Sequence, residues 1–390
     1  MQRLDEIRPT WVEINLDNLA YNIREIRKIT KKDTLITAVV KANAYGHGSI
    51  EAAKIFLANG ADRLAVATLS EAIELRKAKI YAPILVLGYI PKSQYPLAIK
   101  WNISQTIYNY ESAKILSNIS QDLGEKSIIH IKIDTGMGRL GFLPKDDSVE
   151  DIVKISQLPN LEIEGIFSHF SKADERDKGY TIYQFESFMD MVKKLDNRGV
   201  YIPIKHISNS AAIIDLPQYH LDMIRPGIML YGYYPSEEVD KDRIVLRPAM
   251  TLKTKVSNIK KVPKGSYISY GGLYVTEKES KIATIPIGYA DGFSRLLTSK
   301  AEAFVKGHRV PVVGRICMDQ CMLDVSNVED VDIDDQIVLF GYEEGQPTVE
   351  DIANKLNTNS YEVICMVGRR VPRVYIQDGQ IIKIVEYLLD

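Results

Sequence analysis

The chain has 390 residues, and its 49 Lys and Arg side chains nearly balance 51 Asp and Glu, for a formal charge of −2. This length predicts two domains, or one large α/β barrel with an attachment. The balanced charge, without a long run of one sign, argues against a nucleic-acid partner and favours small, neutral or zwitterionic ligands.

The first residues, MQRLDEIRPTWVEI, carry charges where a signal peptide has its apolar segment. No later apolar run approaches the length of a membrane span. We therefore expect a cytoplasmic protein with no membrane partner.

Strand-like and helix-like segments alternate through the first two thirds of the chain. Eight apolar runs predict strands at residues 34–42, 62–69, 82–88, 103–109, 127–134, 163–170, 202–208 and 224–232. Helical patterns lie between them, in SIEAAKIFLANG, SEAIELRKA, YESAKILSNIS, SVEDIVKISQL and YTIYQFESFMDMVKKLDNRG. This alternation predicts an α/β fold, a (β/α)8 TIM-like barrel; an open doubly wound sheet is the alternative, because counting strands does not show closure.

After about residue 245 the pattern changes to short β-rich runs separated by turn residues, with one expected helix at 348–357. We therefore expect a barrel domain at 1–244 and a mostly β domain at 245–390. Residues 1–14 are expected either in the barrel domain or packed with the β domain.

Cysteine and histidine patterns argue against a metal site. Cys317, Cys321 and Cys365 have no zinc-type spacing, and the six histidines are scattered. We expect free thiols and no bound metal.

Polar side chains stand at the ends of several predicted strands, where barrels of this kind carry their working residues. A single polar strand end commonly meets solvent, but six around one rim predict a site. They are Lys41, Lys132, Asp134, His169, His206 and Arg225.

The loops after the last two predicted strands suggest a phosphate site. SNSAA (208–212) and RPGIM (225–229) offer hydroxyl and backbone donors where such barrels often bind phosphate. A phosphate site near Lys41 predicts pyridoxal 5'-phosphate, held covalently through the lysine amine.

GMGRLG (136–141) is a competing motif, because it matches a dinucleotide-binding pattern and has Glu162 and Glu164 about twenty residues further on. The glycines of that pattern open directly into a helix, whereas FLPKDD intervenes here. We favour a glycine-rich turn that directs Arg139.

Seven motifs together resemble alanine racemase, in register across both expected domains. They are AVVKANAYGHG (38–48), KIDTGMGRLG (132–141), SNSAA (208–212), RPGIMLYG (225–232), SYGGLY (269–274), PIGYADG (286–292) and GRICMDQ (314–320). The resemblance implies a pyridoxal-phosphate-dependent isomerase that interconverts L-alanine and D-alanine and supplies D-alanine for peptidoglycan. It also implies a head-to-tail homodimer, in which the β domain contributes Tyr270 and Met318 to the partner's active site.

The resemblance implies a two-base reaction by Lys41 and Tyr270. A proton has to leave the α-carbon from one face and return on the other, and one base does not easily reach both faces. Lys41 would act on the D-enantiomer and Tyr270, from the partner subunit, on the L-enantiomer.

The other roles follow from the resemblance by position. Arg225 would donate to the pyridine nitrogen, with His169 orienting it, and His206 would assist Tyr270. The expected cofactor-binding set is Lys41, Tyr45, Leu87, His169, Asn209, Ser210, Arg225, Gly227, Ile228 and Tyr361.

Arg139 and the backbone of Met318 would bind substrate, with Asp319 in support. Lys132 matches a position often carbamylated in the family; an unmodified lysine is the alternative. The substrate entrance would comprise Asp174, Tyr289, Arg295 and Arg315, and Asn359 replaces an aliphatic residue just before Tyr361.

Two other functions stay open. A racemase of this fold could act on serine or another amino acid, because the catalytic residues touch only groups common to all amino acids. A non-catalytic pyridoxal-phosphate-binding barrel would need Lys41 and the phosphate loops but not the β domain. A decarboxylase of similar architecture is a weaker alternative.

Overall fold

The computed structural model describes residues 4–389, which fall into two compact units. The barrel unit comprises Leu19–Ala44 and Ser49–Arg247. The β unit comprises the described residues up to Asn18, the stretch Tyr45–Gly48 and the chain from Pro248 onward.

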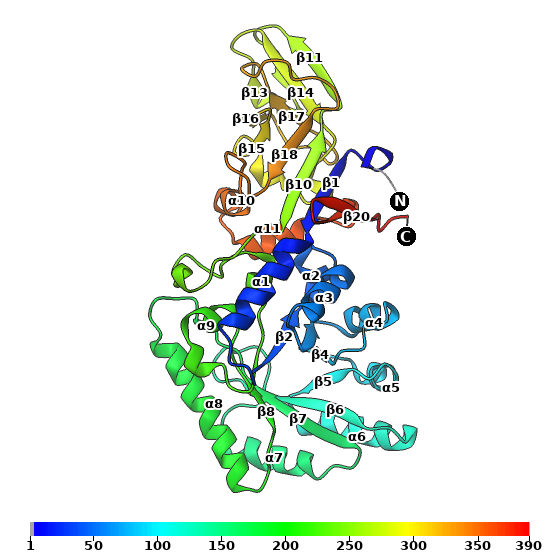
Figure 1. The fold of residues 1–390 in the computed structure, drawn as a ribbon, viewed down its shortest axis with the longest axis vertical. Coiled ribbons are helices and arrows are strands. Elements are labelled where there is room, and N and C mark those ends of the chain that lie inside the picture. Colours follow the sequence, from blue (N-terminus) through cyan, green and yellow to red (C-terminus); the bar gives the residue numbers. More distant parts are fainter. Residues whose placement is uncertain (1–3, 390) are drawn as a thin grey trace. The chain divides into compact units, whose positions relative to one another are not determined.

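The barrel unit is built on eight parallel strands in the order β8-β7-β6-β5-β4-β3-β2-β9 (Figure 1). They are β2 (Leu35–Val39), β3 (Arg63–Val66), β4 (Ile84–Val86), β5 (Ser104–Ile107), β6 (Ser127–Lys132), β7 (Leu161–Phe167), β8 (Ile204–His206) and β9 (Met223–Ile224). Backbone bonds from Asp222 N to Lys205 O (3.1 Å) and from Arg225 N to Ser208 O (3.0 Å) join the outermost strands. The sheet is therefore a nearly closed barrel, as the sequence predicted.

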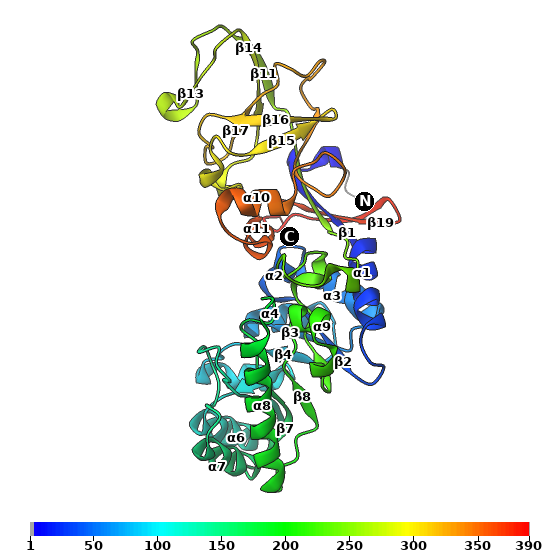
Figure 2. The same cartoon turned by 90° about the vertical axis from the view of Figure 1, so that its left-hand side faces the viewer.

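Helices follow the strands and cover the outside of the barrel, with α6, α7 and α8 on one side (Figure 2). Their amphipathic faces pack inward and their ends carry capping residues, such as Thr68 and Glu71 before and within α4. The helices are α1 (Leu16–Lys28), α3 (Ser49–Ala58), α4 (Leu69–Lys77), α5 (Tyr95–Lys100), α6 (Tyr110–Leu123), α7 (Asp146–Ser156), α8 (Gly179–Asn197) and α9 (Ser210–Asp215). The segment labelled α2 (Lys41–Tyr45) is a left-handed turn.

Most predicted elements of the barrel are present. The eighth strand is the main difference, because β9 has only two residues and the segment after it forms the 3-10 helix η4 (Ile228–Tyr231). Tyr231 Oη donates to Val39 O (2.8 Å), so η4 is fastened to the end of β2.

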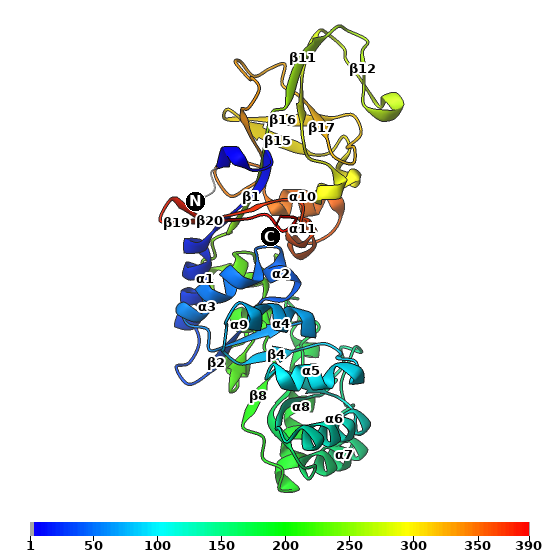
Figure 3. The same ribbon diagram turned by 90° about the vertical axis from the view of Figure 1, so that its right-hand side faces the viewer.

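The β unit contains a sheet in the order β11-β14-β17-β16-β15-β18-β10-β1-β19-β20. Its strands are β1 (Thr10–Asn15), β10 (Met250–Lys255), β11 (Asn258–Val262), β14 (Ser280–Ile285), β15 (Glu302–Val305), β16 (His308–Val313), β17 (Cys321–Asp324), β18 (Gln336–Phe340), β19 (Arg373–Gln377) and β20 (Gln380–Val385). A separate hairpin pairs β12 (Tyr267–Ile268) with β13 (Tyr274–Val275). Figure 3 shows β1, in blue, beside the red β19–β20 hairpin.

Two short helices complete the β unit: α10 (Val349–Leu356), which the sequence predicted, and α11 (Ser360–Met366), which it did not. Thr348 caps α10 and Asn359 caps α11 through side-chain bonds to backbone N–H groups. No helix in the part of the chain that the structure describes has the length and apolar character needed to cross a membrane.

Arg373 fixes the stretch Tyr45–Gly48 within the β unit. Its guanidinium is fully buried and donates to four backbone carbonyls, those of Gly46, Val367, Gly368 and Val371, at 2.6–3.1 Å. Burying a cation is costly unless its donors are satisfied. The four carbonyls meet that requirement and hold the turn against the end of α11.

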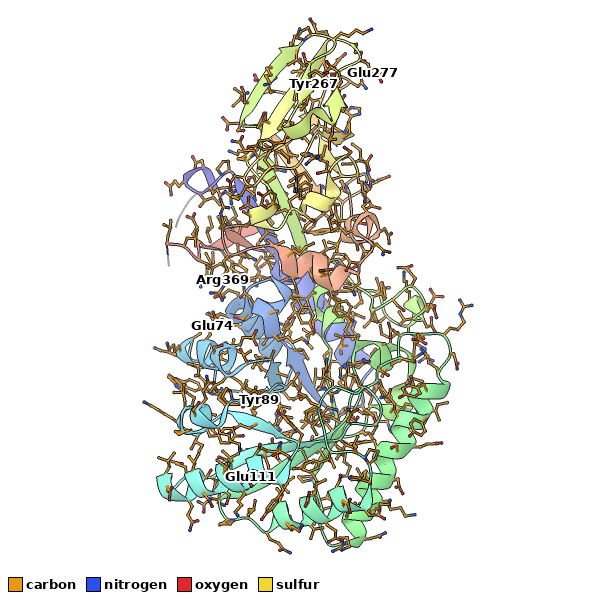
Figure 4. The ribbon with its side chains drawn as sticks, turned by 180° about the vertical axis from the view of Figure 1, so that it is seen from behind. Glu74, Tyr89, Glu111, Tyr267, Glu277 and Arg369 are labelled. Carbon is orange, nitrogen blue, oxygen red and sulfur yellow. The ribbon has the colours of Figure 1, made fainter. Side chains whose placement is uncertain are left out.

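Replacing Arg373 by leucine should therefore destabilise the protein by about 3 kcal/mol, because the carbonyls that it serves would remain buried without donors. Urea unfolding measures this loss. The matched control is Arg369→Leu, an exposed arginine labelled in Figure 4 that also lies near the Tyr387 ring. Equal stabilities of the two variants would contradict the role given to Arg373.

Candidate active site

Lys41 begins a left-handed turn that directly follows strand β2. The four residues after it, Ala42, Asn43, Ala44 and Tyr45, have φ between 51° and 54°, and none is glycine. Left-handed backbone costs roughly 1–2 kcal/mol per non-glycine residue. Strain of this kind is typical of functional sites, where the surrounding structure has to enforce it.

Side chains of the barrel unit brace this turn. Glu71 accepts from Ala42 N (2.6 Å) through one oxygen, and from Ala67 N and Thr68 N through the other. Asn43 Oδ1 accepts from Ser49 N at the start of α3 (2.9 Å). The end of β2 is thus tied to the end of β3 and to the following helix.

Arg225 lies fully buried after β9 and makes its hydrogen bonds through Nη1 and Nη2. Nη1 donates to His206 Nδ1 (2.6 Å), and Nη2 to Ser168 O (2.8 Å), Ile207 O (3.1 Å) and His169 Nδ1 (3.2 Å). Burial, and then the charge of Arg139, lowers the pKa of Arg225 to about 9. None of these bonds to the described residues uses Nε, so its hydrogen can be donated to another acceptor.

The histidines of this cluster are neutral. Burial, followed by the charge of Arg225, moves the pKa of both His169 and His206 well below the usual value. His169 contacts Arg225, as predicted. His206 is fully buried, with Arg225 on one ring nitrogen and His130 on the other (2.9 Å). Neither ring nitrogen is therefore left for the predicted assistance to Tyr270.

Lys132, the last residue of β6, is buried beside the same cluster. Its Nζ donates to Ile133 O (2.6 Å) and lies 5.4 Å from the centre of the Phe167 ring. Burial, then the charge of Arg225, lowers the pKa of Lys132 to about 7; Asp134 opposes this shift and Arg139 adds to it. A neutral amine is therefore well populated near neutral pH.

The glycine-rich turn after β6 is built around Asp134. Asp134 Oδ1 accepts from Gly136 N, Met137 N and Gly138 N (2.9–3.1 Å), and these bonds lower the pKa of the carboxyl group although burial opposes them. The chain then pairs Phe142 with Ile133 before α7 begins at Asp146. No helix follows the glycines directly, so the dinucleotide alternative fails, and the turn instead carries the exposed Arg139.

The two expected phosphate loops meet. Gly227 N donates to Ser210 Oγ (2.9 Å), so the loop after β9 contacts the first residue of α9. Asn209 caps α9 and also donates to Phe170 O (3.3 Å). Ile228 is buried at the start of η4, and Leu87 follows β4 at the same end of the barrel.

Tyr45 and Tyr361 form a pair within the β unit. Their ring centres are 6.2 Å apart, and burial, followed by the nearby Tyr361 and Cys365, raises the pKa of Tyr45. Tyr361 lies on α11, and Asn359, where the resemblance implied an aliphatic residue, is the N-cap of that helix. Asn359 therefore starts the helix that carries Tyr361.

Tyr270 lies on the short 3-10 helix η6 (Tyr270–Gly272) and is 72% exposed. Ser269 before it has φ of 65° and donates from Oγ to Arg315 O (2.7 Å). Arg315 Nε is buried below Gly271 without a hydrogen-bond partner among the described residues. Tyr267, labelled in Figure 4, is equally prominent on β12.

The loop bearing Met318 rests on the loop bearing Tyr289. Tyr289 N donates to Cys317 O (3.1 Å) and Ala290 N to Met318 O (3.0 Å). A Cβ at Gly288 would meet both carbonyl oxygens at 2.3–2.4 Å, so this backbone contact requires glycine. Asp319 accepts from Arg370 Nη2 (2.8 Å), and Nε of the same arginine lies 3.6 Å from the buried Asp291.

The remaining entrance residues lie on separate segments. Arg295 is exposed at the start of η8 (Arg295–Leu297) in the β unit. Asp174 belongs to the barrel unit, where its carbonyl accepts from Ser236 Oγ (2.7 Å). Within residues 4–389, no group of three or more His, Cys, Asp or Glu side chains is arranged to hold a metal ion.

The structure thus gathers several of the predicted residues into one set in the barrel unit and two pairs in the β unit. In the barrel unit, the charges of Lys41, Lys132, Arg139 and Arg225 all act on His169. In the β unit, the sets are Tyr45 with Tyr361, and Met318 with Tyr289. The residues that sequence analysis missed here are Glu71, Ser168 and His130.

The depressed pKa of Lys132 predicts a pH-dependent stability. The folded protein binds fewer protons than the unfolded chain between about pH 7 and about 10.5, so this lysine makes the free energy of unfolding rise with pH in that window. Lys132→Met removes that rise. The stability of the variant relative to the parent should therefore fall as the pH increases from about 7 to 10.

Urea unfolding in buffer free of carbon dioxide tests this, with the exposed Lys126→Met on the same segment as control. A stability difference that does not change with pH would show that Lys132 keeps its ordinary pKa.

Comparisons with known proteins agree over nearly the whole chain. Residues 14–235 match the alanine racemase N-terminal domain and residues 249–375 the alanine racemase C-terminal domain. An alanine racemase of Clostridium tetani is 54% identical over 98% of this chain and 99% of its own. The structure of an alanine racemase from Clostridium difficile superimposes with a TM-score of 0.95 at 48% identity, covering 97% of this chain and 99% of its own.

An alanine racemase from Bacillus anthracis, solved with bound L-Ala-P, superimposes with a TM-score of 0.94 at 38% identity over 98% of this chain and 99% of its own. Both sequence and structure therefore match the same family through both units. The chain belongs to the alanine racemase family of isomerases.

Proposed function

We propose that this enzyme interconverts L-alanine and D-alanine with pyridoxal 5'-phosphate, using Lys41 and Tyr270 as its two bases. The observation that carries the proposal is the cluster at the strand ends of the barrel. There Lys41 lies on a strained turn, and Arg225 is buried beside two neutral histidines, His169 and His206. The names of the relatives supply the substrate, alanine.

The donor set fits pyridoxal phosphate. Lys41 offers a primary amine. Arg225 offers its Nε–H group, because its hydrogen bonds to the protein use Nη1 and Nη2. Ser210, Gly227 and Ile228 lie where two loops of the barrel unit meet, and within the β unit Tyr45 and Tyr361 form a pair that offers phenol groups. Asn209 and Leu87 flank these positions.

The bound cofactor would supply an electron-withdrawing ring that makes the proton on the substrate α-carbon more acidic. Lys41 would bind it covalently and exchange a proton on one face of the α-carbon. Tyr270 would exchange a proton on the other face, which allows the configuration to invert. Arg139 and the Met318 backbone would orient the substrate carboxylate, and Asp319 would hold the Met318 loop through Arg370.

Arg225 sets a limit on this chemistry. A guanidinium only donates hydrogen bonds, so it cannot take the place of a carboxylate that would keep the ring nitrogen protonated. Its lowered pKa, about 9, still leaves it a cation near neutral pH. We infer that Arg225 keeps electron withdrawal moderate, which favours return of the proton over side reactions.

We also propose a homodimer with composite active sites. Tyr270 is 72% exposed, and Tyr267 and Leu273 beside it are exposed as well. Monomeric proteins seldom expose several large apolar side chains on one small hairpin without a use for them. The occupant we propose is the barrel of a second copy, with Asp174, Tyr289, Arg295 and Arg315 around the entrance.

Purified protein loaded with pyridoxal phosphate should form D-alanine from L-alanine, and Lys41→Ala and Tyr270→Phe should each abolish this activity. Mixing the two inactive variants should restore it, because a hybrid dimer has one site with both groups intact. Random exchange predicts about a quarter of the parent activity. A chiral assay for D-alanine measures the recovery.

Serine, lysine and arginine serve as competing substrates in the same assay. A larger kcat/KM for any of them would overturn alanine as the substrate, and absence of every D-amino acid would leave a non-catalytic barrel. Failure of confirmed hybrid dimers to recover activity would contradict the composite sites.

We further propose that Lys132 is carbamylated. Its pKa near 7 leaves much of the amine neutral and therefore nucleophilic. Addition of carbon dioxide releases a proton and gives a negatively charged carbamate, which attracts the Arg139 cation that a charged lysine would repel. Isotope-labelled bicarbonate should give a carbamate signal that disappears in Lys132→Met. An unchanged spectrum in that variant would place the signal on another amine.

A further inference from the structure

A continuous chain of buried polar side chains crosses the interior of the barrel below Arg225. Arg225 Nη1 contacts His206 Nδ1 (2.6 Å), His206 Nε2 contacts His130 Nδ1 (2.9 Å), and His130 Nε2 contacts Glu164 Oε2 (2.9 Å). Arg63 on β3 forms an ion pair with the same oxygen of Glu164. The chain thus links side chains from β3, β6, β7 and β8 to the cofactor end of the barrel.

Only one arrangement of hydrogens satisfies these contacts. Arg225 can only donate, so His206 accepts at Nδ1 and carries its hydrogen on Nε2. His206 Nε2 then donates to His130 Nδ1, which leaves the hydrogen of His130 on Nε2, facing the Glu164 carboxylate. Every bond therefore points the same way, from the guanidinium to the carboxylate.

The surroundings keep both histidines neutral. Burial lowers the pKa of His130, against the opposing effect of Glu164, and moves that of His206 well below its usual value. Glu164 stays ionised: burial would raise its pKa, but hydrogen bonds from His130 and Arg63 outweigh burial and lower it to about 2. The two imidazoles therefore separate a fixed negative charge from a fixed positive one.

Packing holds the chain in place. The His206 ring stacks on Phe167, with ring centres 4.7 Å apart and planes 7° from parallel. The neighbouring position 165 requires glycine, because a Cβ there would lie 2.2 Å from His130 Nδ1. The backbone of β7 thus leaves space for the His130 ring.

We propose that Glu164 is a positioning residue for the racemase reaction, and that it acts on Arg225 through His130 and His206. Aligned hydrogen bonds polarise one another, so the carboxylate makes His206 Nδ1 a stronger acceptor. The hydrogen bond from Arg225 Nη1 to His206 Nδ1 then polarises the guanidinium toward the barrel interior and fixes its orientation. The donor that Arg225 offers to the ring nitrogen is correspondingly weaker and better fixed.

The proposal rests on the proposed use of Arg225 toward the cofactor, but its first test needs no cofactor. Histidine labelled with a nitrogen isotope reports by NMR which ring nitrogen carries the hydrogen. Both His130 and His206 should be neutral with the hydrogen on Nε2, in the cofactor-free and the loaded protein alike. His220, whose Nε2 lies 3.1 Å from Ile213 O, and His47, whose Nδ1 lies 3.1 Å from Tyr45 O, are internal references for the two tautomers.

A hydrogen on Nδ1 of either histidine, or a positive charge on either ring, would overturn the proposal. This measurement uses the unmodified protein, so it stands even if substitutions in the chain prevent folding. It is also independent of catalysis, so its failure is distinguishable from failure of the proposed racemase activity.

The second test removes the charge at the far end of the chain. Glu164→Gln should shift the NMR signal of the bound cofactor's ring nitrogen toward that of a protonated ring and lower kcat roughly tenfold, with KM for alanine within about twofold. The matched control, Glu162→Gln, changes the same charge on an exposed position of the same strand and should alter neither quantity.

Identical ring-nitrogen signals in the folded Glu164→Gln and Glu162→Gln proteins would overturn the relay, whatever the rates. A shifted signal confined to Glu164→Gln would support it, since a merely structural defect would not change the hydrogen bond at the cofactor in that direction.

Discussion

The arrangement of the barrel depends on one buried cation. Arg225 is enclosed at the strand ends, where its partners among the described residues are two imidazoles and two backbone carbonyls. Because a guanidinium has donors only, each of these partners has to accept. That requirement fixes the tautomer of His206, the direction of the chain to Glu164 and the donor left for a ligand.

The lysine motif is constrained in a different way. Its backbone takes up a left-handed turn without glycine at four successive positions, which the chain does not adopt unaided. Glu71 and Ser49 hold the first part of the turn in the barrel unit, and Arg373 holds Gly46 in the β unit. The segment that carries Lys41 is thus strained and braced along its length, which would preorganise the amine for the reaction that we propose.

Burial at the barrel end, together with the charge of Arg225, explains why several ionisable groups near the site have altered pKa values. Lys132, His169 and His206 all share the barrel end with Arg225 and are shifted toward their neutral forms. Neutral groups can accept hydrogen bonds or attack carbon dioxide, whereas their cations cannot. Burial, and after it the charge of Arg225, therefore keeps these neighbours of the arginine largely neutral.

Sequence periodicity was sufficient for the barrel and for the strand-end positions of Lys41, His206 and Arg225, because local patterns encode strand ends. It did not reveal β1, whose partners β10 and β19 lie hundreds of residues away, or α11, which is only seven residues long. His130 and Glu164 each resembled an ordinary polar strand position. Only the pairing of β6, β7 and β8 brings them into line with His206.

The left-handed turn was equally hidden, since the residues that adopt it have no preference for positive φ. The resemblance to a known family supplied what periodicity could not, namely Tyr270 and Met318. It did not supply the interior of the barrel, where polar side chains replace the apolar filling expected of this fold.

Neutron diffraction from a deuterium-exchanged crystal tests the central claim most directly, because it locates the hydrogens between Arg225 and Glu164. We predict deuterium on Nε2 of both His206 and His130, none on Nδ1 of either, and none on the Glu164 carboxylate. Deuterium on His206 Nδ1 would contradict the account, since it would show that Arg225 does not fix the direction of the chain.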